Sequence, residues 1–425
     1  MKKFILADCN NFYVSCEKIF NPSLNNKPVV VLSSNDACVI ARSNEAKKLG
    51  IKMGDPAFEC KEIFEKHNVI VYSANFTLYG DISKRVMQTL SSFATDIEIY
   101  SVDEAFLFLS NHNSQFEKDE NYHANYCRYI RIETKQRIGI PISFGIGQTK
   151  TLAKIATDLA KKDPTGVFDI SIVKNIDDIL SKIDVADIWG IGYRYSRMLK
   201  NKNILTARDF KYLKDDWVRK NMTIMGLRTL LELRGTPCFK LNDIIENKQS
   251  ITVSRLFGRP VKNITELKQA AASYTVCAAQ KLRQQKSIAG SINVFVVTTR
   301  YHDPQRYYDA TFIELPIATS YTPDLIKAVH SCIKKLFRPG LIYKKTGIIL
   351  TDIVDENCRQ LNLYEPLPDT TTQSHLMKII DSANNKLGKN KVTFAAAGIE
   401  QEWKMKQLKK SACFTTNWHE IKIVT

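Results

Sequence analysis

The sequence contains no run of about 20 uncharged apolar residues, the length that a helix needs to cross a membrane. Its first residues resemble a signal peptide only briefly, because their apolar run is short and ends at Asp8. The 10 cysteines include no Cys-x-x-Cys pair, which argues against structural zinc and against a disulfide framework. These absences favour a protein of the reducing cytoplasm.

Internal repeats and low-complexity tracts are also missing, and the 44% apolar content excludes wholesale disorder. A chain of 425 residues is too long for one hydrophobic core, so roughly two to four domains are expected. The net charge of +17 favours a polyanionic partner, nucleic acid before a membrane surface. Charge alone leaves open that the chain binds no such partner.

Apolar runs and segments of helical periodicity alternate near the start of the chain in the order β-α-β-β-α-β, which predicts a split β-α-β sandwich. Residues 23–80 interrupt this order and are predicted to form an inserted subdomain. The expected strands are residues 4–7, 29–32, 38–41, 69–72, the two arms of 97–109, and 142–146, and the expected helices are 10–20, 43–49, 75–93, 122–137 and 149–162.

Residues 177–246 have helical periodicity, and a second α/β unit begins near residue 250. Residues 250–355 contain 15 Lys and Arg against 7 Asp and Glu, a net charge of +8. The later residues are less regular, and 367–372 are predicted to form a linker. In the second unit the expected strands are 251–257, 291–298, 310–315 and 346–353, and the expected helices are 264–284 and 325–337.

Three acidic residues are the candidate catalytic centre. Asp8 ends the first expected strand, and Asp103 and Glu104 lie at the tip of the hairpin 97–109. Because these strands are neighbours in a split β-α-β sheet, the three carboxylates can converge. Mg²⁺ would relieve their repulsion, and two ions about 3.5–4 Å apart can activate a 3′-hydroxyl and neutralise pyrophosphate. The alternative is that Asp8 caps the following helix and the other two acids form a solvated turn.

Two glycine-rich stretches resemble nucleotide-binding motifs. Residues 145–151 lack the spacing of a phosphate-binding P-loop and are predicted to be a strand end followed by a helix start. Gly190, Ile191 and Gly192 lie within the helical segment, where backbone N–H groups can approach a DNA phosphate. An ordinary turn between helices explains these three residues equally well.

Several long motifs in the right order resemble those of Y-family translesion DNA polymerases, and the likeness runs over the whole chain. They are residues 8–17, 100–106, 150–161, 187–192 and 398–405. The resemblance implies an α+β multidomain right hand. Its expected parts are a ferredoxin-like palm (1–22 and 81–170), small fingers (23–80), a helical thumb with a helix-hairpin-helix (171–246), an α/β little finger that grips DNA (250–355) and a C-terminal tail (356–425).

The resemblance also implies an activity, namely error-prone, template-directed DNA synthesis past damaged bases in the SOS response, without proofreading. It places the side chains of Asp8, Asp103 and Glu104 and the backbone carbonyl of Cys9 on two Mg²⁺ ions. Primer-template DNA and deoxynucleoside triphosphates are the implied substrates.

The residues expected at the nucleotide follow from the same resemblance. Tyr13 falls at the steric gate, an aromatic ring beneath the sugar that would collide with a 2′-hydroxyl, and Phe12 lies beside it. Lys161 falls at a triphosphate-binding lysine.

The fingers depart from the family pattern at two positions. Asn44 stands where many members have a triphosphate-binding tyrosine, and Lys47 stands where they have an arginine. Lys47 can bind phosphate as a point charge rather than as a planar fork, and Arg42 could compensate.

A short peptide after the basic unit, with Gln360, Leu361, Leu363 and Tyr364, resembles the segment by which bacterial polymerases dock on the sliding clamp. The alternative is a surface strand. The family resemblance further implies a cleaved UmuD-like dimer and a RecA filament as partners, and residues 394–425 are the candidate contact region.

Two other classes of protein fit part of the pattern. Purine-nucleotide cyclases use a similar palm with paired acids, but they need neither a helix-hairpin-helix nor a basic little finger. An inactive DNA-binding scaffold would be expected to lose one of the acids, and all three are present.

Overall fold

The computed structural model describes residues 3–109, 121–240, 247–298, 307–360, 370–388 and 391–421. The chain divides into two compact units. The first consists of Met1–Ser33, Ala37–Ile244 and Lys409–Thr425, and the second of Ser34–Asp36 and Ile245–Leu408. Within the described ranges no helix is long and apolar enough to span a membrane.

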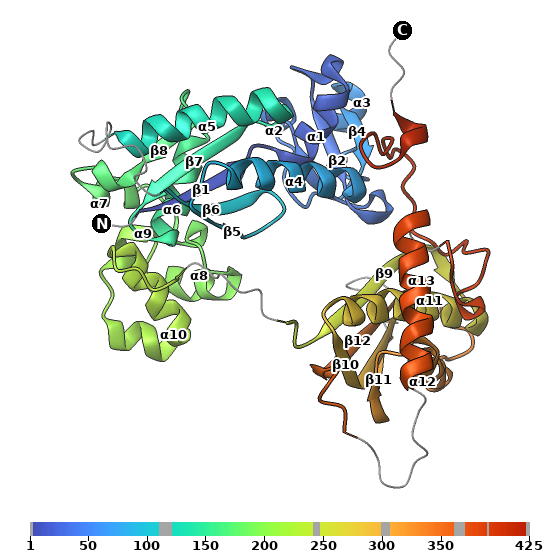
Figure 1. Ribbon diagram of the computed structural model, residues 1–425. Helices are drawn as coiled ribbons and strands as arrows, with labels where there is room; N and C mark the ends of the chain where they lie inside the picture. Colours follow the sequence, from blue (N-terminus) through green and yellow to red (C-terminus); the bar gives the residue numbers. More distant parts are fainter. Residues whose placement is uncertain are drawn as a thin grey trace. The chain divides into compact units, whose positions relative to one another are not determined.

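A five-stranded sheet with the strand order β5-β6-β1-β7-β8 forms the centre of the first unit. The strands are β1 (Phe4–Cys9), β5 (Asp96–Ile99), β6 (Glu104–Phe108), β7 (Ile142–Gly147) and β8 (Val167–Asp169), and the helices against them are α4 (Phe76–Ser91), α5 (Tyr122–Ile138) and α6 (Lys150–Ala160). The first strand, dark blue in Figure 1, pairs antiparallel with both β6 and β7. Strands β1, β5, β6 and β7 with α4 and α5 have the ferredoxin-like order, which confirms the predicted fold. Strand β8 extends this sheet, parallel to β7.

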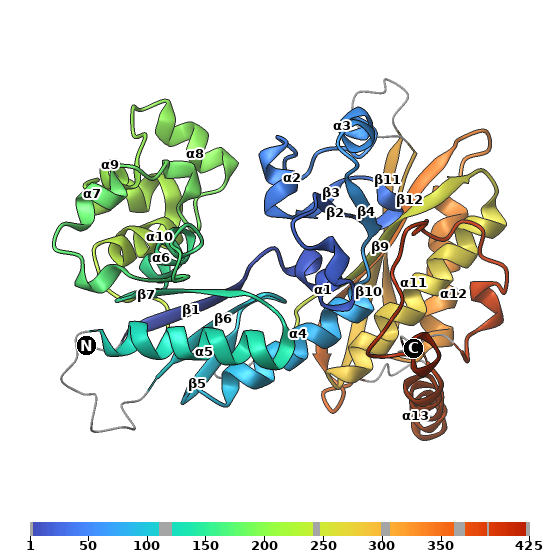
Figure 2. The ribbon, with the colours of Figure 1, turned by 90° about the horizontal axis from the view of Figure 1, so that it is seen from above.

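Residues of β1 alternate between the two faces of the sheet. Ala7 and Cys9 belong to the core beneath α4 and α5, whereas Leu6 packs with Phe106 on the side of α6. Figure 2 shows α4 and α5 on one side of the sheet and α6 on the other. Asp8 follows the alternation of Leu6, so the strand directs its carboxylate toward α6.

Glycines in β7 allow α6 to pack closely on the sheet. A Cβ at Gly145 would lie 2.2 Å from the backbone nitrogen of Thr157, and a Cβ at Gly147 would lie 2.7 Å from that of Ala153. Thr149 caps α6, because its side chain accepts a hydrogen bond from the backbone of Leu152. The Gly-x-Gly sequence is therefore a strand followed by a helix start, as predicted, and its glycines serve packing.

A smaller three-stranded sheet with the order β3-β2-β4 lies in the region expected to form the fingers. Its strands are β2 (Val29–Leu32), β3 (Val39–Arg42) and β4 (Ile70–Ser73), and the helices of this part are α1 (Phe12–Phe20), α2 (Asn44–Lys48) and α3 (Lys61–Lys66). The helix predicted from residue 10 begins at Phe12, because Asn11 has a left-handed backbone with φ of 48°.

Four helices pack around a separate core in the region expected to form the thumb. They are α7 (Ile176–Leu180), α8 (Tyr193–Lys200), α9 (Ala207–Lys211) and α10 (Asp215–Leu233). Leu152 and Ile155 of α6 belong to the same core. Glu232, which is fully buried, accepts a hydrogen bond from the backbone of Thr151 at 3.0 Å and so joins α10 to the start of α6. Helix α6 is thereby held from both sides.

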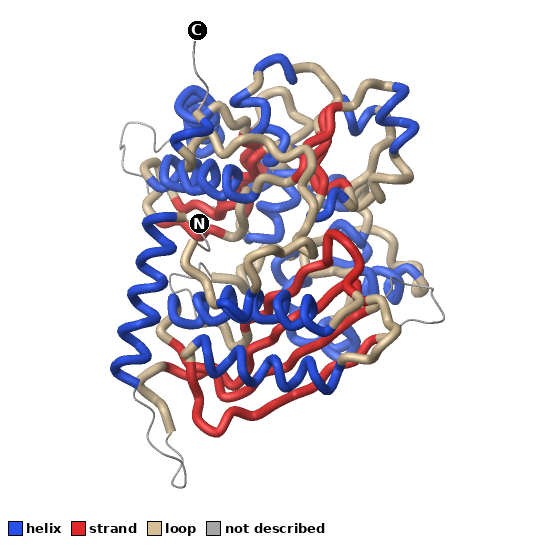
Figure 3. The backbone as a smooth tube through the Cα atoms, turned by 90° about the vertical axis from the view of Figure 1, so that its right-hand side faces the viewer, coloured by secondary structure: helices blue, strands red, loops and turns tan. Residues whose placement is uncertain are grey.

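The second unit contains a four-stranded antiparallel sheet with the order β11-β10-β12-β9. Helices α11 and α12 lie over one face of this sheet (Figure 3). The strands are β9 (Ile251–Val261), β10 (Ser287–Val297), β11 (Tyr308–Thr319) and β12 (Tyr343–Asp355), all longer than predicted, and the helices are α11 (Ile264–Gln284), α12 (Thr322–Leu336) and α13 (Thr370–Leu387).

The predicted linker 367–372 is wrong in its last three residues, because α13 begins at Thr370. The linker was predicted from its Pro, Asp and Thr residues, but Asp and Thr also favour the start of a helix. The ion pair between Arg283 and Asp381, with Nε and Oδ2 at 2.7 Å, fixes α13 on the second unit. Trp403 is buried in the same core beside Phe257 and Tyr274.

The close approach of α6 to β7 predicts that Gly145→Ala lowers the free energy of unfolding by about 1–3 kcal/mol, because the new methyl group meets backbone that must shift. Gly80→Ala is the matched control, since Gly80 is an exposed position of α4 where an added methyl group would have no atom within 4 Å. The control should be stable or gain about 0.5–1 kcal/mol. Denaturant unfolding of both variants decides, and equal stability would contradict the packing account.

Candidate active site

The three acidic residues lie at one end of two paired strands. Asp8 of β1 is directly opposite Glu104 of β6, and the backbone N–H of Cys9 donates to the carbonyl oxygen of Asp103 at 2.9 Å. Asp8 is only 7% exposed. The structure therefore brings together the acids that are 95 positions apart in the sequence. Asp8 does not cap the following helix, whose N-cap residue is Asn11 without a side-chain cap.

Each carboxylate has a polar neighbour. Lys161 Nζ lies 2.8 Å from Asp8 Oδ2, and Lys154 Nζ lies 3.1 Å from Glu104 Oε1. The hydroxyl of Ser101 donates to Asp103 Oδ1 at 2.6 Å. The sequence interpretation assigned Lys161 but missed Lys154 and Ser101. The seven-residue spacing of the two lysines was an available signal, because it places both on one face of α6.

Burial and charge set the protonation of this centre. Burial raises the pKa of Asp8 to about 6, the Lys161 ammonium opposes this shift, and the charges of Glu104 and Asp103 add to it. Among the described residues no three His, Cys, Asp or Glu side chains already have the geometry of a metal site. The donor set consists of carboxylate and carbonyl oxygens around a buried acid that favours added positive charge, so it fits a hard divalent ion such as Mg²⁺.

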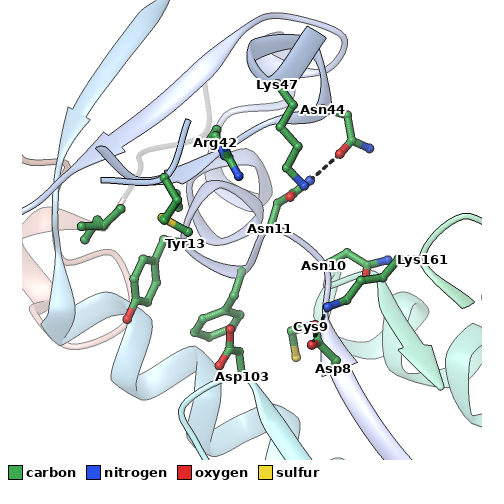
Figure 4. Close-up of a pocket in the computed structure, with 14 residues that line it drawn as sticks. Asp8, Cys9, Asn10, Asn11, Tyr13, Arg42, Asn44, Lys47, Asp103 and Lys161 are labelled. Carbon is green, nitrogen blue, oxygen red and sulfur yellow. Dashed lines mark hydrogen bonds and ion pairs between the residues drawn. The ribbon is translucent and has the colours of Figure 1, made fainter. Parts of the chain in front are cut away.

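A cavity of about 440 Å³ opens beside these acids, a size suited to a small ligand. Figure 4 shows Asp8 and Asp103 on one side of it and Arg42 and Lys47 on the other, with Lys161 next to Asp8. The lining residues are Asp8, Cys9, Asn10, Asn11, Phe12, Tyr13, Ile40, Ala41, Arg42, Asn44, Lys47, Met53, Asp103 and Lys161. All five residues predicted to bind nucleotide line this cavity, together with three of the four predicted metal ligands. Glu104 does not line it.

The cavity concentrates positive charge. Burial lowers the pKa of Lys47, and the charges of Arg42 and Lys161 lower it further, whereas Asp8 raises it. The Arg42 guanidinium also donates to the carbonyl oxygen of Ile51 at 2.7 Å. An anionic ligand in the cavity would be attracted by all three cations.

Asn44, at the position where the family resemblance suggested a tyrosine, accepts a hydrogen bond from Asn11 Nδ2 at 3.0 Å. Both side chains line the cavity, and the dashed line in Figure 4 marks their contact. The residues predicted to bind nucleotide did not include Asn11. Its backbone is left-handed, with φ of 48°, a conformation that asparagine tolerates.

Aromatic rings form another part of the cavity. The ring of Tyr13 stacks on Tyr79 with centroids 4.7 Å apart and an interplanar angle of 18°. It meets Phe76 edge-on at 5.8 Å and lies 5.8 Å from Phe12. Phe12 is buried, whereas Tyr13 is half-buried at the cavity wall. Burial raises the pKa of the Tyr13 phenol, and the charge of Asp103 raises it further.

The residues predicted to bind DNA do not line this cavity. Gly190 and Gly192 are exposed, Gly190 has φ of 92°, and Ile191 between them is buried in the helical core. A backbone approach to phosphate by the two glycines stays a prediction. Of the clamp peptide, Gln360 is described, and Leu361, Leu363 and Tyr364 lie outside the described residues.

Comparisons with known proteins match nearly the entire chain. Residues 7–158 match the impB/mucB/samB family, residues 248–363 match the impB/mucB/samB family C-terminal domain, and residues 374–424 match a domain of unknown function (DUF4113). Protein UmuC of Salmonella typhimurium is 39% identical over 422 residues, which cover 98% of this chain and 99% of that protein.

More distant matches point to DNA polymerases by name. DNA polymerase IV of Saccharolobus solfataricus is 29% identical over 303 residues, covering 69% of this chain and 82% of that protein. Among solved structures, a Y-family DNA polymerase chimera has a TM-score of 0.66 at 22% identity and covers 83% of this chain and 99% of its own. This last similarity supports the fold.

The raised pKa of Asp8 predicts a pH-dependent effect of Asp8→Asn in the absence of divalent ions. Folding of the wild type takes up a proton at this carboxyl between its unfolded pKa of 3.8 and its folded pKa of about 6, so the wild type loses this contribution to stability as the pH rises. Relative to the wild type, the variant should therefore gain on the order of 2 kcal/mol between pH 4 and pH 7.

Denaturant unfolding in the presence of a chelator at both pH values measures this difference. Asp96→Asn is the control, because Asp96 is an exposed residue of the same sheet. If the variant instead loses stability relative to the wild type as the pH rises, the Lys161 ammonium outweighs burial in setting the pKa of Asp8.

Proposed function

We propose that this chain, which belongs to the impB/mucB/samB family, is a template-directed DNA polymerase that copies past damaged bases with low fidelity and without proofreading. The similarity to DNA polymerase IV and the fold shared with a Y-family DNA polymerase support this reaction. A purine-nucleotide cyclase is less well supported, because it would not need the basic second unit. By the same family resemblance, the activity belongs to the SOS response.

One arrangement carries the proposal. Asp8 and Glu104 are paired across adjacent strands, Asp103 adjoins them, and the cavity beside them presents Arg42 and Lys47 on its opposite side. Acidic oxygens on one side and cations on the other suit a nucleoside triphosphate that is bound together with divalent metal ions. A site for a neutral ligand would not need this separation of charge.

The metal ions proposed here are two Mg²⁺ ions, held by the carboxylates of Asp8, Asp103 and Glu104 and by the backbone carbonyl of Cys9. When bound, they supply positive charge that activates the primer 3′-hydroxyl and stabilises the leaving pyrophosphate. The chain itself supplies these oxygen donors from the end of β1, from the first residue of β6 and from the residue before it. Lys161 and Lys154 now neutralise two of these donors, and each ammonium becomes available to phosphate oxygens once its carboxylate is bound elsewhere.

The nucleotide would lie with its triphosphate toward Arg42, Lys47 and Lys161 and its sugar over Tyr13. Lys47 has no carboxylate within salt-bridge distance among the described residues, and burial with two neighbouring cations lowers its pKa, so binding an anion there is favourable. The ring of Tyr13, packed against Tyr79 and Phe76, cannot withdraw easily from a 2′-hydroxyl. Phe12 supports it from within the core.

DNA would be held by the thumb and the second unit, with sequence-independent contacts to phosphate. The excess of Lys and Arg in residues 250–355 and the exposed backbone at Gly190 and Gly192 support this assignment. We further propose that residues 360–364 bind the bacterial sliding clamp. A cleaved UmuD-like dimer and a RecA filament are proposed as partners, and the cytoplasm as the location, from the resemblance alone.

The metal-binding role predicts that Asp103→Ala or Glu104→Ala abolishes nucleotide addition and leaves the affinity for primer-template DNA within about threefold of the wild type, because these acids contact metal and not DNA. Primer extension and a DNA-binding isotherm on the same preparation test this. Asp96→Ala, an exposed acid of the same hairpin, is the control and should extend primers normally. Extension by both active-site variants near the wild-type rate would remove the metal-site assignment.

The steric-gate role predicts that Tyr13→Ala gives a folded protein that accepts ribonucleotides, because the ring no longer meets the 2′-hydroxyl. Tyr13→Phe is the matched control, since it keeps the ring and should still reject them. Incorporation of one ribonucleotide and of its deoxy counterpart measures the selectivity of each variant.

A purely structural Tyr13 gives a different result. In that case Tyr13→Ala would lower the free energy of unfolding by about 3–5 kcal/mol, as for a buried aromatic residue, and would leave selectivity unchanged. That outcome would refute the gate.

A further inference from the structure

The carboxy-terminal end of the described chain returns to the first unit and pairs with the fingers sheet. The backbone N–H of Ser73, the last residue of β4, donates to the carbonyl oxygen of Lys409 at 3.0 Å, and the Ser73 hydroxyl oxygen accepts from the backbone N–H of Lys409 at 2.9 Å. Ser73 and Lys410 form a parallel β-bridge. In Figure 1 the red C-terminal segment lies beside β4.

Buried polar groups extend this attachment. Asn75 is fully buried, and its Nδ2 donates to the carbonyl oxygens of Ser411 at 3.0 Å and Ala412 at 3.2 Å. Its Oδ1 caps α4 by accepting from the backbone N–H of Leu78. A little further on, Phe414 stacks on Phe20 of α1 with ring centroids 4.7 Å apart. The segment is thus bound to α1, which carries the aromatic residues of the cavity wall, and to α4, which carries the rings packed against Tyr13.

Three successive contacts connect this segment to the proposed gate. Glu17 of α1 is 2% exposed, and its Oε1 accepts a hydrogen bond from the Ser411 hydroxyl at 2.9 Å and another from the Tyr79 hydroxyl at 2.6 Å. Tyr79 is 1% exposed and is the ring on which Tyr13 stacks. An unbroken chain of contacts therefore runs from Ser411 through Glu17 and Tyr79 to Tyr13.

We propose that the segment 409–413 is part of the nucleotide-selecting apparatus, and that Ser411 acts through Glu17 and Tyr79 to position the ring of Tyr13. The inference rests on the proposed role of Tyr13 as the gate. Ser411, Glu17 and Tyr79 are positioning residues, since none of them lines the cavity. The segment lies within the stretch that matches a domain of unknown function, and this role would be one contribution of that stretch.

The physical reason is the cost of a buried carboxylate with an incomplete set of donors. Burial raises the pKa of Glu17, and the hydrogen bonds from Tyr79 and Ser411 lower it. Without the Ser411 hydroxyl, Glu17 has fewer donors, and the carboxylate must rotate toward another donor or take up a proton. Either change weakens the hold on the Tyr79 hydroxyl and frees the Tyr79 ring, which supports Tyr13.

The test compares discrimination between deoxyribonucleotides and ribonucleotides in variants of the full chain, measured as the ratio of kcat/KM values on one primer-template. Ser411→Ala and Tyr79→Phe should each lower the ratio by about tenfold, the effect that one hydrogen bond to a charged group typically has. Ser411→Thr keeps the hydroxyl and should restore the ratio. Thr416→Ala, at an exposed position three residues beyond the segment, should match the wild type.

Two additional readouts separate positioning from general damage. Affinity for primer-template DNA should stay unchanged in Ser411→Ala. In the double variant Ser411→Ala with Tyr13→Ala, the ratio should equal that of Tyr13→Ala alone, because the serine acts only through the ring. Titration of each nucleotide onto a complex with a dideoxy-terminated primer gives the same comparison as a ratio of Kd values if a variant is too slow to assay.

The outcomes are distinguishable. If Tyr13→Ala relaxes selectivity while Ser411→Ala and Tyr79→Phe discriminate like the wild type, the gate stands and the positioning role of the segment is overturned. If Tyr13→Ala itself keeps full discrimination, the gate assignment has failed and the inference falls with it. Losses of selectivity that simply add in the double variant would place Ser411 on a route that does not pass through Tyr13, which also overturns the proposal.

Discussion

The pairing of Asp8 with Glu104 across two central strands is the constraint on which the rest of the first unit depends. Two acids held this close on a buried sheet face need positive charge nearby. Helix α6 provides it with Lys161 and Lys154, and it reaches the sheet only because glycines in β7 leave room for its backbone. The core formed with helices α7 to α10 holds the outer face of the same helix. The packing of this one helix on both sides therefore determines where the positive charges lie relative to the acids.

The cavity beside the acids has opposite charges on its two sides, so it can orient a bound ligand. Arg42 and Lys47 lie across the cavity from Asp8 and Asp103, so a triphosphate would have one favourable orientation, and its sugar would then lie toward Tyr13. Tyr13 belongs to the wall of the cavity and stacks on Tyr79, whose hydroxyl is held by Glu17, which in turn contacts the C-terminal segment. Selection of the sugar would then depend on residues more than 300 positions from the acids in the sequence.

The elements that carry the acids were predictable because the patterns that specify them are local in the sequence. The alternation that ends at Asp8, the hairpin around Asp103, and the helix after Gly147 each follow from short-range patterns, and the motifs supplied their order. Contacts that join distant segments were not predictable. The residues around Asn11 do not indicate that its side chain bonds to Asn44. Those around Ser411 do not indicate that its hydroxyl bonds to Glu17. Lys154 was missed because the interpretation took one lysine from the helix rather than the whole face. The start of α13 was missed because residues 367–372 have the composition of a linker.

The central claim is that the three acids form the binding site for two divalent ions together with an incoming nucleotide. Titration with Mn²⁺, followed by electron paramagnetic resonance, tests this most directly on the full chain bound to a dideoxy-terminated primer-template and a matched deoxynucleoside triphosphate. The account predicts two bound ions per chain with the magnetic coupling expected of a pair about 3.5–4 Å apart, and loss of the coupled pair in Asp8→Asn. The account would be contradicted if the protein bound no more Mn²⁺ than the free nucleotide carries. It would also be contradicted if the Asp8→Asn variant kept the full signal of the coupled pair.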